Sequence, residues 1–313
     1  MEDKNSSGLA DMTRREFTWR TLKFGAAAAL GLMLPSCSKS PKYIPVIGYD
    51  PYVEDNEILL IPFSGRRQIA SVSIDDMIFT RKSGARIENF DAIKMLLDIN
   101  GMGYGYGEMR FEHPIKVGDK IQVISWHRIY EFIPNDPKSL KPITPEGEYW
   151  GDQWKTLQGH IVREGGKPVN NSSIMFYIFK DGKWKSITGV YNLSLTFSPD
   201  GKKAYSAGKK IFEYDMVEND DNITMKEIRT KNKIRDEFDD IREVKAIPDG
   251  YVFICRVKDH DWEIWRTDLN WTQAVCIDRS PGAKLDLRTS KDYMAYEVLH
   301  SGRNRVNVTP LKK

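Results

Sequence analysis

Short apolar runs rich in β-branched and aromatic residues alternate with clusters of turn residues along most of the chain. The clearest set of four such runs covers 193–197, 203–206, 211–215 and 223–228. The first two runs flank the turn 198–201 (SPDG), in which proline presets φ and glycine accepts a positive φ. This pattern predicts antiparallel strands. Beyond residue 56, the best helix candidate is one short segment, 91–98.

The same plan of four runs repeats further along the chain. The second set covers 241–247, 251–257, 262–268 and 273–277, again with a Pro-Asp-Gly turn after its first run. Corresponding turn positions are Pro199, Pro248 and Ser290, at steps of 49 and 42 residues. A period in the forties with four strands per repeat is typical of β-propeller blades. Earlier strand pairs are expected at 120–133, around Trp126-His127, and at 174–187, around the turn 180–183.

The segment 197–205, FSPDGKKAY, resembles the repeat of TolB-like and related WD-like propellers. The resemblance is strong in this repeat, fair in the next two and faint in the first half of the chain. It implies an all-β propeller. Dividing the 277 residues after position 36 by a step of about 46 predicts six four-stranded blades, and five or seven also fit. A β-sandwich with irregular insertions is the competing fold.

The last repeat, 284–309, has room for three strands, which leaves its blade one strand short. An unpaired edge exposes backbone donors and acceptors, so a fourth strand is expected from elsewhere. The apolar run 57–63 is the candidate, and its pairing with the last repeat would close the ring.

The amino terminus has the anatomy of an export signal. A charged start precedes a 12-residue apolar run, 24–35, which is too short to span a bilayer. Arg14, Arg15 and Phe17 resemble the twin-arginine signal of bacteria, although Thr18 and Trp19 depart from it. A short amphipathic helix at the start of a cytosolic protein is the alternative.

The segment 34–37, LPSC, follows the apolar run directly and resembles a bacterial lipobox, with an atypical proline. Cleavage before Cys37 and acylation there would anchor the mature chain in a membrane. The alternative is a lone buried cysteine. The predicted organisation is a signal peptide at 1–36, a tether rich in Pro, Ser and Tyr at 37–56, and a propeller at 57–313. Twin-arginine export would carry the passenger already folded.

Charge and cysteine content exclude several partners and site types. The net charge of +3 gives no field that would indicate nucleic acid. Cys255 and Cys276 are expected on strands two apart, with backbones about 9 to 10 Å from each other, which is too far for a disulfide. The sequence therefore predicts free thiols and no zinc site built from paired cysteines.

Histidines and aromatic residues supply the candidate binding positions. None of the five histidines forms a close metal-binding pair, although residues distant in sequence can meet at a propeller's central channel. His260, in the triplet 259–261 (DHD), is a candidate because carboxylates could orient its imidazole; a solvated loop is the alternative. Tyr104, Tyr106, Trp150 and Trp154 could contact a sugar or protein, with packing between blades as the alternative.

No nucleophile elbow, pair of catalytic carboxylates or quinone-cofactor pattern is present, and the sequence leaves the cofactor unknown. Two functional hypotheses follow. The first is a lipid-anchored envelope propeller that binds a protein or glycan partner. The second is an exported propeller enzyme, a hydrolase or lyase, or an accessory subunit of an exported redox enzyme.

Overall fold

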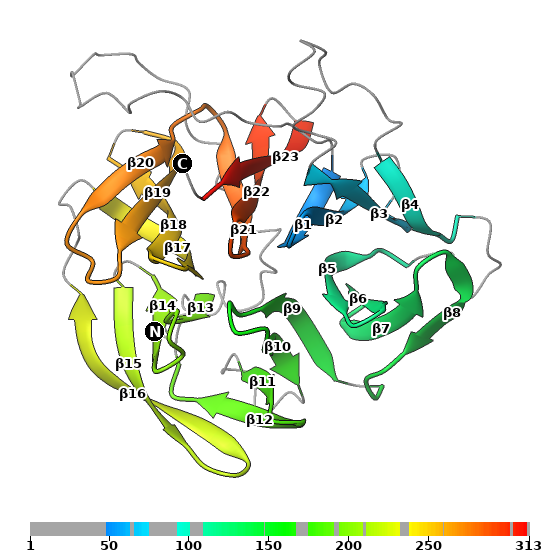
Figure 1. The fold of residues 1–313 in the computed structure, drawn as a ribbon, viewed down its shortest axis with the longest axis horizontal. Coiled ribbons are helices and arrows are strands. Elements are labelled where there is room, and N and C mark those ends of the chain that lie inside the picture. The colour runs from blue at the N-terminus through cyan, green and yellow to red at the C-terminus, as the bar shows by residue number, and fades with distance from the viewer. Residues whose placement is uncertain are drawn as a thin grey trace, which may run out of the picture.

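The computed structural model describes residues 48–62, 66–74, 93–100, 109–146, 148–166, 175–190, 194–208, 211–231, 238–258, 260–300 and 303–311. The elements that lie wholly within these ranges are all β-strands (Figure 1). This described part of the chain contains no helix of the length and hydropathy needed to cross a membrane.

The strands fall into six consecutive antiparallel groups, called units 1 to 6. Unit 1 comprises β1 (Gly48–Glu54), β2 (Glu57–Pro62), β3 (Gln68–Ser73) and β4 (Ile93–Asp98). Unit 2 comprises β5 (Glu112–Val117), β6 (Lys120–Ser125), β7 (Arg128–Ile133) and β8 (Asp136–Pro142). Unit 3 comprises β9 (Tyr149–Lys155), β10 (Ile161–Gly166), β11 (Phe176–Lys180) and β12 (Lys183–Thr188).

Unit 4 comprises β13 (Ser194–Phe197), β14 (Lys203–Ala207), β15 (Ile211–Glu218) and β16 (Asn222–Lys231). Unit 5 comprises β17 (Phe238–Ile247), β18 (Gly250–Val257), β19 (Trp262–Asp268) and β20 (Ala274–Asp278). Unit 6 has three strands in the described residues, β21 (Ala283–Thr289), β22 (Tyr293–His300) and β23 (Arg303–Pro310).

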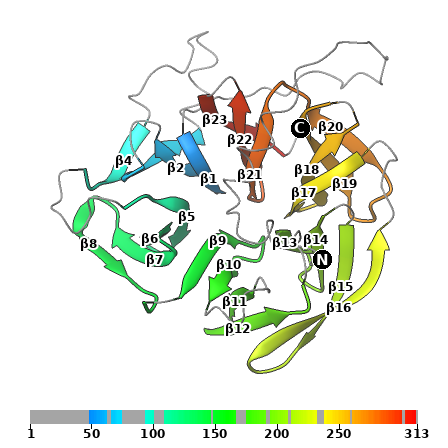
Figure 2. The same ribbon diagram turned by 180° about the vertical axis from the view of Figure 1, so that it is seen from behind.

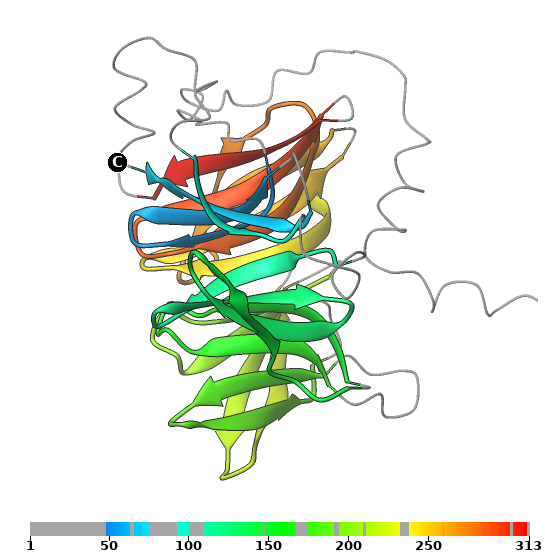
Figure 3. The ribbon, with the colours of Figure 1, turned by 90° about the vertical axis from the view of Figure 1, so that its right-hand side faces the viewer.

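The units are arranged around a common axis, as expected for a propeller (Figures 1 and 2). Seen from the side, their strands run across the thickness of the ring (Figure 3). The first strand of each unit, β1, β5, β9, β13, β17 or β21, lies innermost, and chain order follows the ring. Units 3 and 4 are also joined at their outer edge, where β12 and β16 pair in parallel and complete an eight-stranded sheet.

The predicted turns form the hairpins of several units. The Pro-Asp-Gly turns join β13 to β14 and β17 to β18. Trp126 and His127 both have positive φ (51° and 61°) between β6 and β7, and Asp181 and Gly182 do so between β11 and β12 (52° and 78°). Two residues with positive φ give the turn whose twist matches that of a hairpin.

The apolar core consists of clusters that lie between neighbouring units. Units 1 and 2 share the largest cluster, which includes Leu59 and Val123. Trp154 and Leu195 belong to the cluster between units 3 and 4, and further clusters join units 4 to 5 and 5 to 6. Because side chains alternate along a strand, each sheet contributes one face to each of its two neighbours.

Unit 6 also meets unit 1 through a cluster of apolar side chains. This corrects the prediction that the run 57–63 pairs with the last repeat to close the ring. The apolar residues of β2 do not complete the last sheet; β2 pairs with β1 and β3 in unit 1. Ile58 and Leu60 instead pack face to face against Ala295, Val306 and Val308 of unit 6. The physical reason is that β1 already pairs with β2, so within the described residues the ring closes through side chains and not through a shared strand.

Two further expectations differ from the structure. The helix candidate 91–98 contains the edge strand β4 over its described residues, because pairing with β3 outweighs a weak local helical pattern. The segment assigned to a tether, 37–56, contains β1, the innermost strand of unit 1. Its Tyr52 and Val53 are buried in the cores on either side of unit 1, so the folded domain begins before residue 57.

Candidate functional site

Three innermost strands, β1, β5 and β21, are interrupted by a bulge. The register breaks lie at Tyr49/Tyr52, Glu112/Ile115 and Leu285/Arg288. Within these breaks Asp50, His113 and Asp286 have positive φ of 46°, 48° and 50°. The left-handed region costs an L-residue roughly 1–2 kcal/mol, and bulges re-aim side chains next to functional sites. The three side chains are therefore turned out of the regular pleat.

Each bulge is held by a buried polar side chain from a neighbouring unit. Glu297 of β22 accepts a hydrogen bond from the Asp50 amide (2.5 Å). Glu243 of β17 accepts from the amides of Asp286 (3.1 Å) and Leu287 (2.9 Å). Gln153 of β9 donates to the His113 carbonyl (2.9 Å). The backbone groups that a bulge removes from the ladder are thus satisfied, and the strained conformation is fixed.

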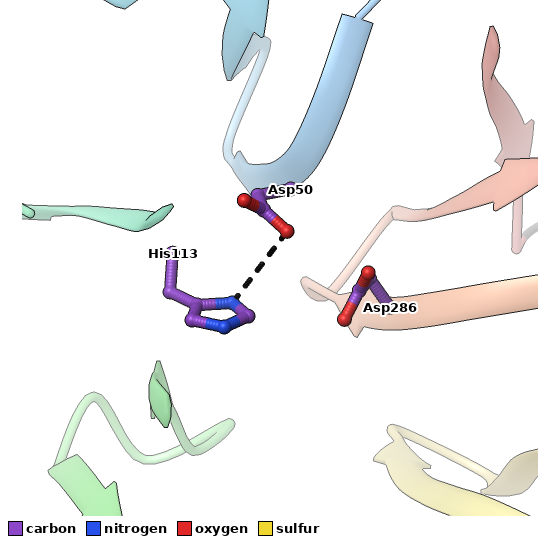
Figure 4. A group of neighbouring side chains, drawn as sticks. All are labelled: Asp50, His113 and Asp286. Atoms are coloured by element: carbon purple, nitrogen blue, oxygen red, sulfur yellow. Dashed lines mark ion pairs between the residues drawn. The ribbon is translucent and has the colours of Figure 1, made fainter. Parts of the chain in front are cut away.

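The side chains from the bulges meet where the inner strands of the ring come together (Figure 4). One ligand atom from each of Asp50, His113 and Asp286 lies within 4.8 Å of the others. His113 Nδ1 lies 3.8 Å from Asp50 Oδ1 and 3.3 Å from Asp152 Oδ1 of β9. Arg288 Nη2 donates to Asp152 Oδ1 at 2.7 Å and lies 3.2 Å from His113 Nδ1. These five residues are called the axial cluster.

Two opposing effects act on the His113 imidazole. Burial lowers its pKa, but the carboxylates of Asp152, Asp50 and Asp286 raise it, and the resulting pKa lies above the ordinary value despite the Arg288 charge. The carboxylates therefore favour a cation at the position of the ring. Chemically, the cluster can bind a cation or polar ligand, or hold a proton between an imidazole and carboxylates.

No protein-family model and no curated protein matches the chain. Among solved structures, the gluconolactonase of Xanthomonas campestris is similar with a TM-score of 0.53 and 12% identity, over 86% of this chain and 88% of that one. The chain has the β-propeller fold. A putative TolB from Agrobacterium tumefaciens is also similar (TM-score 0.49, 13% identity, 86% and 91% covered). So is TolB from Acinetobacter baumannii (0.45, 12%, 79% and 60%).

The sequence-predicted contact residues that the structure describes are not members of the axial cluster. Trp150 is buried with Ile124 and Ile129 of unit 2, and Trp154 meets Phe176 edge-on in the core between units 3 and 4. Both indoles occupy packing positions, which was the alternative for them. His260 lies between β18 and β19 with its side chain 38% exposed, and its Nδ1 is 3.7 Å from Glu263 Oε1.

The remaining predicted positions lie outside the described residues; they are Arg14, Arg15, Phe17, Cys37, Tyr104 and Tyr106. Cys255 on β18 and Cys276 on β20 are free thiols, as expected.

The five residues of the axial cluster were not singled out from the sequence. They come from four units, and no fixed spacing connects them. A usable signal was present in the strand pattern: Asp50 and His113 are charged or titratable residues inside apolar runs, and each is followed by proline. Such an interruption is typical of a bulge or an edge.

Proposed function

We propose that this chain is a lipid-anchored β-propeller of the bacterial cell envelope that binds a protein or glycan partner, and that its six units are six blades. The observation that carries the proposal is the axial cluster. Titratable side chains from β1, β5, β9 and β21 converge at the axis, and those from β1 and β5 and Asp286 of β21 stand on strained backbone positions. Burying charge and straining backbone both cost stability, and such features concentrate at ligand sites.

The proposed anchor rests on the amino-terminal sequence. Arg14, Arg15 and Phe17 match the core of a twin-arginine signal, and Cys37 follows shortly after the apolar run. From Cys37 to Gly48 at the start of β1 is a distance of at most about 40 Å, since an extended chain spans roughly 3.3–3.6 Å per residue. A lipid on Cys37 would therefore keep the propeller close to the membrane surface.

Mass spectrometry of the native amino terminus tests the anchor. We expect an acylated Cys37 as the first residue and release of the protein from membranes in Cys37→Ala. A mature chain that begins upstream with an unmodified cysteine would exclude lipid anchoring. Replacing Arg14 and Arg15 with lysine should stop export of the folded chain, and undiminished export would assign the signal to the general secretory route.

Partner binding is tested by capture from detergent-solubilised membranes. The bait is the wild-type chain or a double variant of the axial cluster, Asp152→Asn with Arg288→Gln. The matched control makes the same two changes in an exposed ion pair away from the axis, Asp249→Asn with Arg266→Gln. We expect one stoichiometric partner with the wild type and the control and its loss with the axial variant. Equal capture by all three baits would place partner binding elsewhere.

The second candidate function is a hydrolase or lyase. It is favoured by the His113 imidazole, which has carboxylates at 3.3 and 3.8 Å, an arrangement suited to general acid–base catalysis. The similar gluconolactonase of Xanthomonas campestris shows that an enzyme can be built on this fold. Turnover of a lactone or glycan that is lost in His113→Gln and kept in His260→Gln would favour this function over binding alone.

A further inference from the structure

We infer that Asp50, His113 and Asp286 form a binding site for a divalent metal cation. The inference concerns the site of the proposed function and rests on it for the role of the cluster, but not for the identity of the partner. Two carboxylates and an imidazole are common metal ligands. Their ligand atoms already lie within 4.8 Å of one another, so small side-chain rotations bring all three to one ion.

The charges of the axial cluster point to a cation. Asp152 is neutralised by the buried guanidinium of Arg288 at 2.7 Å, with both side chains about 5% exposed. The carboxylates of Asp50 and Asp286 have no comparable partner among the described residues. A protonated His113 could offset one of these two negative charges. A divalent ion bound to the neutral ring would offset both.

A buried acceptor supports the inference independently of this charge count. Asp50 is 5% exposed, and its Oδ2 is buried without a hydrogen-bond partner in the described part of the chain. Its Oδ1 faces His113, and Asp286 lies on the same side of the ring (Figure 4). Leaving a carboxylate oxygen desolvated and unpaired is costly. A metal ion bound by both oxygens of this carboxylate would remove that cost.

The surroundings resemble the supporting shell of a metal site. Glu297 and Glu243 fix the backbone of the two aspartates, and Gln153 fixes that of His113. Such outer contacts orient ligands before the ion arrives. His113 and Asp286 are only partly buried, which gives the ion access from solvent. Three protein ligands leave positions open for an oxygen of a partner or substrate.

The donor set selects among divalent ions. Calcium and magnesium prefer oxygen ligands alone, whereas an imidazole favours zinc and its first-row neighbours. We therefore expect Zn²⁺ to bind more tightly than Ca²⁺. Replacing His113 with a residue that offers an oxygen ligand should narrow the difference in affinity between Zn²⁺ and Ca²⁺.

Calorimetric titration of the full-length, detergent-solubilised protein after dialysis against EDTA tests the site. Zn²⁺ and, separately, Ca²⁺ are added to the wild type and to Asp50→Asn, His113→Gln and Asp286→Asn. The matched controls are His260→Gln and Asp249→Asn, which change the same residue types away from the axis. We expect one Zn²⁺ per chain and unchanged binding by the controls. Each axial variant should lose at least about 10- to 100-fold in affinity, because even the loss of an outer-shell partner of a ligand costs that much.

Thermal melts of the metal-free proteins show which variants fold. Should Asp50→Asn fail to fold, His113→Gln and Asp286→Asn decide, because their side chains are less deeply buried. In the Co²⁺-loaded protein, visible absorption that changes in His113→Gln but not in His260→Gln would show imidazole ligation. Zn²⁺ binding that all three axial variants retain within twofold would overturn the inference, as would the absence of stoichiometric binding by the wild type.

Capture of the partner by the EDTA-treated wild type separates the two proposals. If no metal binds and the partner is still captured, the metal site is wrong and the binding function stands. If Zn²⁺ binds at the axial residues and no partner is captured, the metal site stands and the binding function is wrong.

Discussion

Two joints of the ring differ in the residues that form them. One lies between units 6 and 1, and the other lies between units 2 and 3. The first, which closes the ring, contains nine buried apolar residues, among them Ile58, Leu60 and Val306. The second contains three, Ile124, Ile129 and Trp150, packed with the half-buried Tyr177. In the second joint Arg163 donates to Gln122 Oε1 at 2.7 Å, and Gln153 Nε2 donates to the Gln122 carbonyl at 3.1 Å.

The difference shows that apolar burial and directional bonds serve different ends in one ring. Apolar contacts close the ring with little demand on geometry. Buried hydrogen bonds fix positions and are costly when broken. Gln153, which bridges units 2 and 3, also holds the His113 carbonyl, and Glu297 holds the Asp50 amide across the closing joint. In both joints, buried hydrogen bonds position a residue of the axial cluster, whereas the apolar contacts hold the units together.

Deletion of β1 should have the largest effect on the closing joint. Removal of residues 1–55 takes away Tyr52 and Val53 and leaves an edge of β2 unpaired. We expect a loss of more than about 4 kcal/mol in the free energy of unfolding, with aggregation through the exposed edge. Removal of residues 1–46 is the control and should leave the melt unchanged. Equal melting temperatures for the two truncations would show that β1 is not needed for closure.

Leu60→Ala removes apolar contact from the same joint without touching the backbone. Leu60 is fully buried against unit 6, so the cavity should cost about 2–5 kcal/mol of unfolding free energy. Leu269→Ala, at a side chain 46% exposed, should change it by no more than about 0.5 kcal/mol. Denaturant unfolding measures both, and similar values for the two would mean that the closing joint contributes little.

Arg163→Met tests the polar joint. It leaves Gln122 Oε1 buried without its donor, so we expect a loss of about 1–3 kcal/mol in unfolding free energy. Adding Gln122→Met removes the orphaned acceptor, and the double variant should lose less than the sum of the single losses. Strict additivity would show that the two side chains are not coupled.

The outer junction between units 3 and 4 gives the smallest expected effect and a pH dependence. Glu218 accepts from Lys180 (2.5 Å) and Lys185 (2.6 Å), and these bonds hold its pKa below the ordinary value near 4.5. Its stabilisation is complete above pH 4.5 and is lost as pH falls through the lower folded-state value.

Glu218→Gln should therefore cost about 0.2–1 kcal/mol of unfolding free energy at neutral pH and nothing in strong acid. Asp220→Asn is the control. The Asp220 side chain is 99% exposed and its distance to Lys183 Nζ is 3.7 Å, so its ion pair is weaker than those of Glu218. Urea unfolding at several pH values measures the difference. A constant difference down to strong acid would assign the loss to something other than the ion pairs.

Local chemistry made much of the second half of the ring predictable. Each Pro-Asp-Gly turn fixes a hairpin within a few residues, so units 4 and 5 follow from the sequence. The closing joint did not follow, because Ile58 and Leu60 fit either a shared strand or a packed face, and only the pairing of β1 decides between them. The last strand of unit 1 was read as a helix because an edge strand lacks strict alternation.

The axial cluster depended on three-dimensional information. Asp50 and Asp286 are far apart in the chain and become neighbours only when unit 6 meets unit 1. Trp150 is a candidate contact residue in the sequence because it lies close to another tryptophan. Its packing role follows from its position on the sheet face between units 2 and 3. Composition and spacing do not indicate which strand of a unit faces the axis.

The three bulges limit which residues can be exchanged at the axis. At a φ near 50°, aspartate, asparagine, histidine and glycine are tolerated far better than β-branched residues. Asparagine would remove one negative charge, histidine would add a nitrogen donor, and glycine would remove the side chain, all on an unchanged ring. A library of these four residues at Asp50, His113 and Asp286 would therefore vary the charge and chemistry of the axis in single steps while the scaffold stays constant.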